Sequence, residues 1–131
     1  MRLHLSLKGF WILVLLGSIT AFACKSGFGG QAPLWTVEGG DQRRGRQAIL
    51  KYGCHACHVI SSIREATGRV GPKLEDIREQ IYLGGVLPNN PENMIQWILN
   101  PQRFSPETAM PDLSVTEQDA RDIAAFLYGK S

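Results

Sequence analysis

The sequence predicts an all-α domain with about four short helices joined by long loops. Apolar residues recur at helical spacing in separate segments, and no segment alternates apolar and polar residues as a strand would. The length of 131 residues suits one domain and excludes a multidomain enzyme. A hydrophobic content of 44% and a charged content of 20% are typical of a globular chain and exclude a disordered one.

The N-terminus carries the pattern of an export signal. Arg2 and Lys8 precede an uncharged run that extends from Gly9 to Cys24. This run is short for a membrane-spanning helix, which needs about 20 residues. It ends in a small-x-small sequence at residues 21–23, so residues 1–23 are predicted to be a signal peptide, with an uncleaved anchor as the alternative. Either reading exports the domain, to the periplasm or the outer face of a bacterial cytoplasmic membrane.

Cys24 follows the expected cleavage site directly, as in a bacterial lipobox. We therefore expect Cys24 to be lipidated and to anchor the chain to a membrane. The alternative is ordinary cleavage that leaves a free thiol. Loss of Arg2 and Lys8 would leave 12 basic and 12 acidic residues, so the net charge gives no support for nucleic-acid binding. Residues 24–40 are rich in glycine and are predicted to be a flexible tether, in which Trp35 could pack locally.

Residues 41–131 form the predicted domain. Its first helix covers residues 41–52, with Asp41 as the N-cap and Gly53 as the stop. Residues 59–73 are predicted to be a loop, and residues 74–83 to hold a short helix that ends at Gly84.

Two further helices complete the domain. Asn90 and Pro91 form an N-cap and first-turn pair, and the helix they open should end before Pro101. Residues 102–115 contain two prolines and no periodicity, which predicts a loop. Thr116 begins a capping box, and the last helix should end at Gly129. About 90 residues in such short elements make a thin core, so a bound group is expected to help stabilise it.

Residues 54–58 read C-x-x-C-H, the attachment signature of a c-type haem. Cys54 and Cys57 would project the same way from one helical turn and could both add to one porphyrin. His58 could then be the proximal iron ligand. The alternatives are a redox dithiol, which would normally accompany a βαβ pattern, a zinc site, which needs four ligands, and a chance match.

The second axial ligand is predicted to be Met110. His55 is too close to His58 along the chain to reach the other face of the ring. Met94 lies on the apolar side of a predicted helix, where core packing explains it. Met110 lies in a loop well beyond His58 and is followed by Pro111, and His/Met is a common pairing in cytochromes c.

Four segments together resemble monohaem class I cytochromes c. They are residues 54–58, 71–74, 89–97 and 109–111, and the resemblance covers residues 41–129. The run 87–93 and the later Trp97 also look like the cytochrome c domain of subunit II of some haem-copper oxidases. The resemblance implies the class I cytochrome c fold, wrapped around one haem c that is bound covalently through Cys54 and Cys57.

The resemblance also implies roles for other residues. The Pro72 carbonyl should accept a hydrogen bond from His58, and the Trp97 indole should point at a haem propionate, with core packing as a compatible role. Tyr82 and Arg78 are weaker propionate candidates. The first helix should meet the last one through Gly45 and Ile49, near Phe126 and Leu127.

The predicted function is electron transfer, in which the haem iron cycles between Fe(II) and Fe(III) and the protein is not an enzyme. With both axial positions filled, no site is open to a substrate. The alternatives are a haem subunit of a larger respiratory oxidoreductase and a haem that binds peroxide or gas ligands. The expected partners are redox proteins, such as a terminal oxidase or a dehydrogenase. Residues 42–73 hold seven basic side chains and one acidic one, and this basic side is expected to steer an acidic partner.

Overall fold

The computed structural model of the chain describes residues 34–129. The elements are, in order, α1 (Gln42–Lys51), α2 (Cys54–Cys57), the 3-10 turn η1 (Ile77–Glu79), β1 (Tyr82–Leu83), β2 (Leu87–Pro88), α3 (Pro91–Leu99), α4 (Pro101–Phe104) and α5 (Glu117–Tyr128). The expected signal peptide, the expected lipidation site at Cys24 and the first part of the expected tether lie outside the described residues. No helix within residues 34–129 has the length and apolar character needed to cross a membrane.

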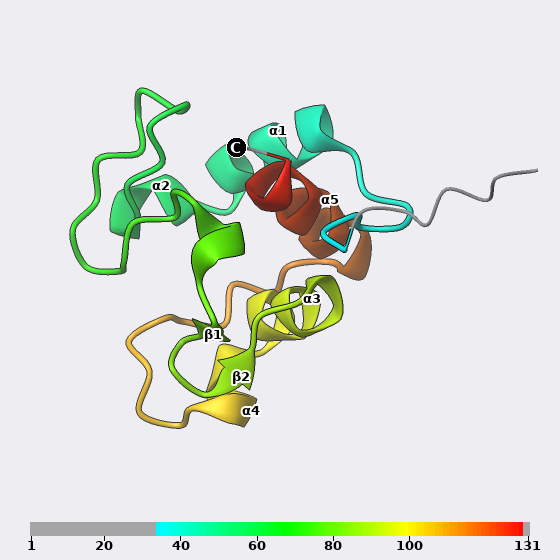
Figure 1. Cartoon of the computed structure of the whole chain (residues 1–131). Coiled ribbons are helices and arrows are strands. Elements are labelled where there is room, and N and C mark those ends of the chain that lie inside the picture. The colour runs from blue at the N-terminus through cyan, green and yellow to red at the C-terminus, as the bar shows by residue number, and fades with distance from the viewer. Residues whose placement is uncertain (1–33, 130–131) are drawn as a thin grey trace, which may run out of the picture. The chain divides into compact units, whose positions relative to one another are not determined.

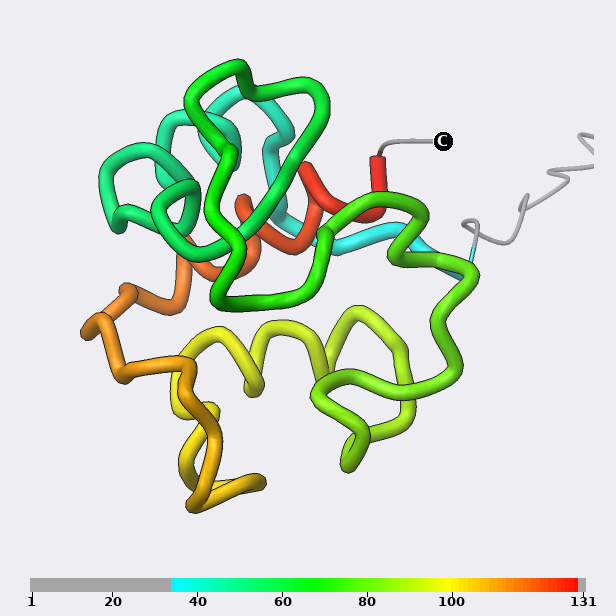
Figure 2. Tube along the Cα trace, turned by 90° about the vertical axis from the view of Figure 1, so that its left-hand side faces the viewer, coloured from blue at the N-terminus to red at the C-terminus, as the bar shows by residue number. Residues whose placement is uncertain are grey.

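The last helix, α5, is packed against both α1 and α3 (Figures 1 and 2). Gly45 lets α1 approach α5 closely, because a Cβ at this position would lie 2.0 Å from the Asp122 carbonyl oxygen and 2.8 Å from the Phe126 Cβ. Ile49, one turn later on α1, is completely buried. The expected contact of Gly45 with the last helix is therefore present.

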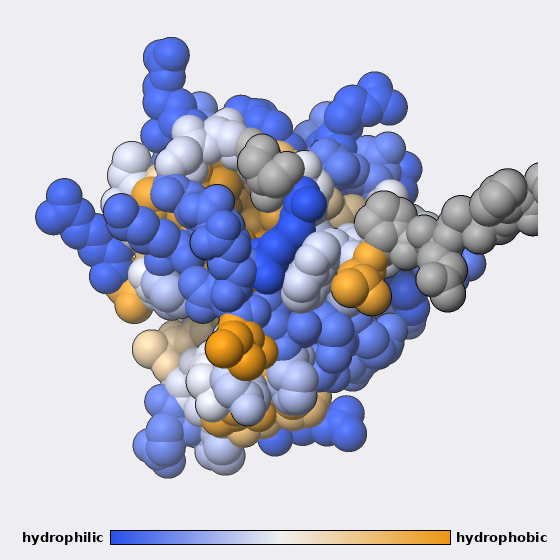
Figure 3. Space-filling model, in the orientation of Figure 1, coloured by the Kyte–Doolittle hydropathy of each residue, from blue (hydrophilic) through white to orange (hydrophobic). Residues whose placement is uncertain are grey.

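The core is built mainly from the apolar faces of α1, α3 and α5. The largest fully buried side chains are those of Ile49, Ile60, Ile63, Ile95, Pro101, Asp122 and Tyr128. Large apolar side chains are also exposed at Leu34, Val70, Ile81, Tyr82 and Val86. One face of the molecule carries its apolar side chains in separate patches among polar ones (Figure 3).

The predicted helix ends agree with the structure. Asp41 caps α1 by accepting a hydrogen bond from the Arg44 N–H at 2.9 Å. Asn90 caps α3 by accepting from the Asn93 N–H at 2.8 Å. Thr116 caps α5, and a serine, threonine, aspartate or asparagine oxygen in this position satisfies an N–H that the helix leaves free.

The helix predicted over residues 74–83 is wrong. Only η1 is helical there. Residues 82–83 pair with residues 87–88 in a short antiparallel hairpin, although the sequence shows no alternation of apolar and polar residues that would predict it. Asp76 has a φ of 49°, which interrupts a right-handed helix. Gly84 and Gly85 have φ values of 55° and 75°, and they turn the chain between the two strands.

One loop prediction also needs correction. Pro101 ends α3 as expected, but it then opens the single turn α4 inside the segment predicted as a loop. In the described part of the expected tether, Trp35, Val37 and Gly39 contact the domain, which includes the local packing that the sequence allows at Trp35. Trp35 stacks on Tyr128 with ring centroids 5.1 Å apart, Val37 is buried, and the Gly39 carbonyl accepts from Gln118 at 2.9 Å. Burial of the large apolar ring of Trp35 gains free energy, which favours packing of this segment over a fully solvated tether.

Candidate functional site

The two cysteines of the C-x-x-C-H run lie on the single turn α2, directly after α1. Gly53 has a φ of 72°, a left-handed conformation that glycine adopts readily, and it turns the chain from α1 into α2. Cys54 and Cys57 are both free thiols and both half-buried. The His58 N–H donates to the Cys54 carbonyl at 3.0 Å, so the histidine is held directly beside the turn.

His58 is oriented by the backbone of the following loop. Its Nδ1 lies 2.7 Å from the Pro72 carbonyl oxygen, the hydrogen bond that the resemblance implied. Because a carbonyl can only accept, Nδ1 carries a proton, so in the neutral imidazole Nε2 is the nitrogen with a lone pair that can bind a metal. Gly71 allows this approach, since a Cβ there would lie 2.3 Å from the His58 Cε1.

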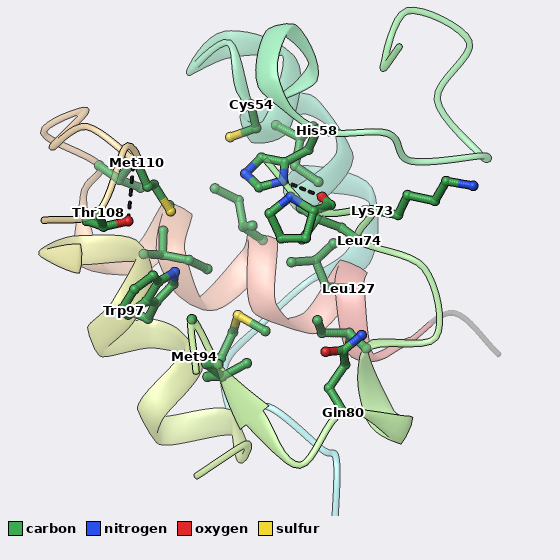
Figure 4. Close-up of a pocket in the computed structure, with 18 of the residues that line it drawn as sticks. Cys54, His58, Lys73, Leu74, Gln80, Met94, Trp97, Thr108, Met110 and Leu127 are labelled. Carbon is green, nitrogen blue, oxygen red and sulfur yellow. Dashed lines mark hydrogen bonds between the residues drawn. The ribbon is translucent and has the colours of Figure 1, made fainter. Parts of the chain in front are cut away.

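An apolar cavity opens beside these residues (Figure 4). It has a volume of about 190 Å³ and adjoins a second cavity of about 180 Å³. Protein interiors are close-packed, with few voids larger than a water molecule, so apolar hollows of this size are candidate ligand sites. Both cavities are lined by Cys54, His58, Pro72, Thr108, Met110 and Leu113.

Helices and loops from the whole domain complete the wall of the larger cavity. α3 contributes Met94, Trp97 and Ile98, and α5 contributes Ile123 and Leu127. The loop before η1 adds Leu74, and η1 and the residue after it add Ile77 and Gln80. The wall is therefore mostly aliphatic and aromatic, and it would exclude water from a flat apolar ligand.

Met110 enters the cavity from the loop between α4 and α5 (Figure 4). Its backbone N–H donates to the Thr108 Oγ1 at 3.2 Å, which fixes the loop just before the thioether. Thr108 carries no motif that marks it as a site residue in the sequence. A threonine two residues before a methionine is a weak signal, because short Thr turns occur in many loops.

Trp97 and Met94 line the same cavity from α3. The six-membered edge of the Trp97 ring lies against Gly84, where a Cβ would be 2.3 Å from Cη2. The indole nitrogen faces the side of the cavity from which Met110 enters (Figure 4). Met94 is buried in the core cluster, as expected.

The two weaker candidates differ in their surroundings. Tyr82 is half-exposed and lines the cavity. Arg78 does not line it, but its Nε is buried and has no hydrogen-bond partner among residues 34–129. A buried donor without a partner costs free energy, so the Arg78 Nε is free to donate to an anionic group such as the propionate that the resemblance implied.

The electrostatics at α2 bear on the redox-dithiol alternative. Burial raises the pKa of the Cys54 thiol above its usual value of 9.0, with a smaller contribution from Cys57. The thiol is therefore protonated at neutral pH, whereas disulfide oxidoreductases rely on a cysteine with a lowered pKa. The raised pKa of Cys54 therefore gives no support to the redox-dithiol alternative.

All six predicted cofactor-binding residues are brought together. Cys54, His58, Pro72 and Met110 line both cavities, Cys57 lines the second, and Trp97 lines the first. They come from four separate parts of the chain, and only the fold brings Pro72, Trp97 and Met110 beside the cysteines.

Comparison with known proteins gives a partial relationship. No family model matches the chain. The chain is 31% identical over 85 residues to a cytochrome c oxidase subunit 2 from Alkalihalophilus pseudofirmus, a match that covers 64% of this chain and 24% of that protein. The chain is similar to cytochrome c oxidase subunit 2. A second such subunit, from Bacillus sp. (strain PS3), is 30% identical over 66 residues, which is 49% of this chain and 18% of that protein. The chain thus spans about a quarter or less of the length of these relatives.

Proposed function

We propose that the chain is an exported electron-transfer protein with the class I cytochrome c fold and one covalent haem c. The observation that carries this proposal is the arrangement of two thiols, an imidazole and a thioether around one apolar cavity. Cys54 and Cys57 would hold the haem through thioether bonds, and His58 Nε2 and Met110 Sδ would bind its iron. The bound haem supplies a one-electron couple between Fe(II) and Fe(III).

The chain's own residues give this site its character. The Pro72 carbonyl fixes the orientation of the His58 ring. This hydrogen bond would also strengthen the donation of the Nε2 electron pair to the iron. The apolar wall keeps water away, which favours the less charged ferrous state. With Met110 bound to the iron, no position on it would be open to a substrate or gas. This arrangement favours a carrier over the alternative of a haem that binds peroxide or gas.

The names of the relatives support an association with a respiratory oxidase. Both are cytochrome c oxidase subunits, although this chain covers only a small part of each. We propose that the protein delivers electrons to such a complex or belongs to one, at the outer face of the cytoplasmic membrane. Lipidation of Cys24 would keep it there.

Attachment of haem is tested on the full-length protein, produced in bacteria that mature c-type cytochromes. Mass spectrometry of the intact protein should find one covalent haem in the wild type and none in Cys54→Ala plus Cys57→Ala. A matched control is Cys24→Ala, which should keep the haem and lose any lipid. A wild type that matures without covalent haem contradicts the proposal.

A further inference from the structure

The side chain of Asn89 is a hydrogen-bond hub beside the cavity. Its Nδ2 donates to two backbone carbonyls, those of Ile77 at 2.5 Å and Gln80 at 2.7 Å. Its Oδ1 accepts from the Tyr128 hydroxyl at 2.5 Å. Both amide protons and the amide oxygen are therefore used, and the side chain has one orientation that satisfies all three bonds.

The two carbonyls belong to the turn that forms one wall of the cavity. Ile77 and Gln80 both line it, at the start of η1 and directly after it. A single 3-10 turn has poor internal hydrogen-bond geometry and holds itself weakly. The residue before this turn, Asp76, has a left-handed backbone conformation with a φ of 49°. Asn89 clamps this turn from outside, at both of its ends.

The side chain of Asn89 is itself held in place by Tyr128, through the hydrogen bond from the Tyr128 hydroxyl. Tyr128, the last residue of α5, is 2% exposed and burial raises the pKa of its hydroxyl, so this group remains a donor at neutral pH. Its ring stacks on Trp35 with an interplanar angle of 25°. A continuous set of contacts thus links Trp35, Tyr128 and Asn89 to the cavity wall.

We propose that Asn89 is a positioning residue for the haem pocket, and that Tyr128 and Trp35 hold it in place. This inference rests on the proposed function. The clamp keeps the turn at residues 77–80 against the cavity and keeps water out of it. The segment before α1 therefore influences the redox site, because its Trp35 supports the brace.

Reduction potential is the readout, since a residue with a purely structural role would lower stability without changing it. Asn89→Ser shortens the side chain and removes the clamp, so water enters and stabilises the more highly charged ferric state. The reduction potential should fall in Asn89→Ser, fall less in Tyr128→Phe, and fall also in Trp35→Ala. The covalent haem should persist in all three variants.

Asn93→Ala is the matched control. It removes one amide-to-carbonyl hydrogen bond, from Asn93 Nδ2 to the Pro88 carbonyl at 2.8 Å, and Asn93 does not line the cavity. Its potential should equal that of the wild type. Tyr128→Phe deletes only a hydroxyl and keeps the stacked ring, so it provides the test if Asn89→Ser fails to fold.

Two outcomes separate this inference from the function on which it rests. A wild type without haem overturns both. A wild type with haem, and with a potential that neither Asn89→Ser nor Tyr128→Phe changes beyond the Asn93→Ala control, overturns the role of Asn89 and leaves the proposed function in place.

Discussion

The Asp122 carboxylate on α5 accepts two hydrogen bonds from the Arg44 guanidinium on α1, at 2.7 and 2.9 Å. Asp122 is 1% exposed and also accepts from the Asp41 N–H at 2.7 Å and from Gln118 at 3.0 Å. This carboxylate therefore fixes α1 relative to α5. The relation matters for the site, because α1 leads directly into the C-x-x-C-H turn and α5 forms part of the cavity wall.

Asp122→Asn should destabilise the protein by about 2 kcal/mol, because it weakens several hydrogen bonds to a buried charge. Because the Arg44 side chain is partly exposed, the loss of stability should be smaller than for a fully buried ion pair. The free energy of unfolding, measured by urea denaturation of the haem-loaded protein, checks this value.

Glu117→Gln is the control for that variant. Glu117 pairs with Arg121 at 2.7 Å one turn away on the surface of α5. Exposed pairs of this kind contribute about 0.5 kcal/mol or less. An equal loss in the two variants would show that the buried position of Asp122 adds nothing.

The same carboxylate predicts a pH dependence. Hydrogen bonds from Arg44 hold the pKa of Asp122 below its usual value of 3.8. Its stabilising contribution is therefore complete above the unfolded value and is lost as the pH falls through the lower, folded value. The free energy of unfolding of the wild type should decrease more steeply below pH 3.8 than that of Asp122→Asn. Parallel curves for the two proteins would contradict this account.

Gly45→Ala should destabilise the protein by about 3 kcal/mol, although alanine is the better helix former, because the added methyl group would overlap the α5 backbone. Thermal unfolding monitored by circular dichroism gives the loss. Gln47→Ala, at an exposed position of the same helix, should change stability little. A Gly45→Ala protein as stable as this control would rule out the close helix approach.

Gly71→Ala should disturb the histidine itself. The added Cβ would lie 2.3 Å from the His58 ring, so the ring must move and its hydrogen bond to Pro72 must lengthen. We expect lower haem incorporation and a changed absorption spectrum. Gly85→Ala, where a Cβ meets nothing within 4 Å but φ is 75°, should cost about 1 kcal/mol of stability and leave the spectrum unchanged. Identical spectra for all three proteins would contradict the close fit at Gly71.

Local signals in the sequence predicted the helix ends well. Asp41, Asn90 and Thr116 cap helices as their side chains suggest, since capping depends on neighbours three residues away. Residues 74–83 were mispredicted because the hairpin depends on pairing across a turn and on a left-handed Asp76. Neither feature leaves a periodic pattern.

The site was predictable where its chemistry is written in adjacent residues. Cys54, Cys57 and His58 form a specific local motif, whereas Asn89 and Asp122 look like ordinary polar residues in the sequence. Their partners lie 39 and 78 residues away, at Tyr128 and Arg44. Burial of such residues follows from tertiary packing, and no local pattern indicates it.

The most direct test of the central claim is the absorption spectrum of the matured protein with and without CO. The wild type should show a sulfur-to-iron charge-transfer band when oxidised and should bind no CO when reduced. Met110→Ala should keep the covalent haem, lose the band and bind CO. Ready CO binding by the wild type, or a band that survives in Met110→Ala, would contradict a haem held between His58 and Met110.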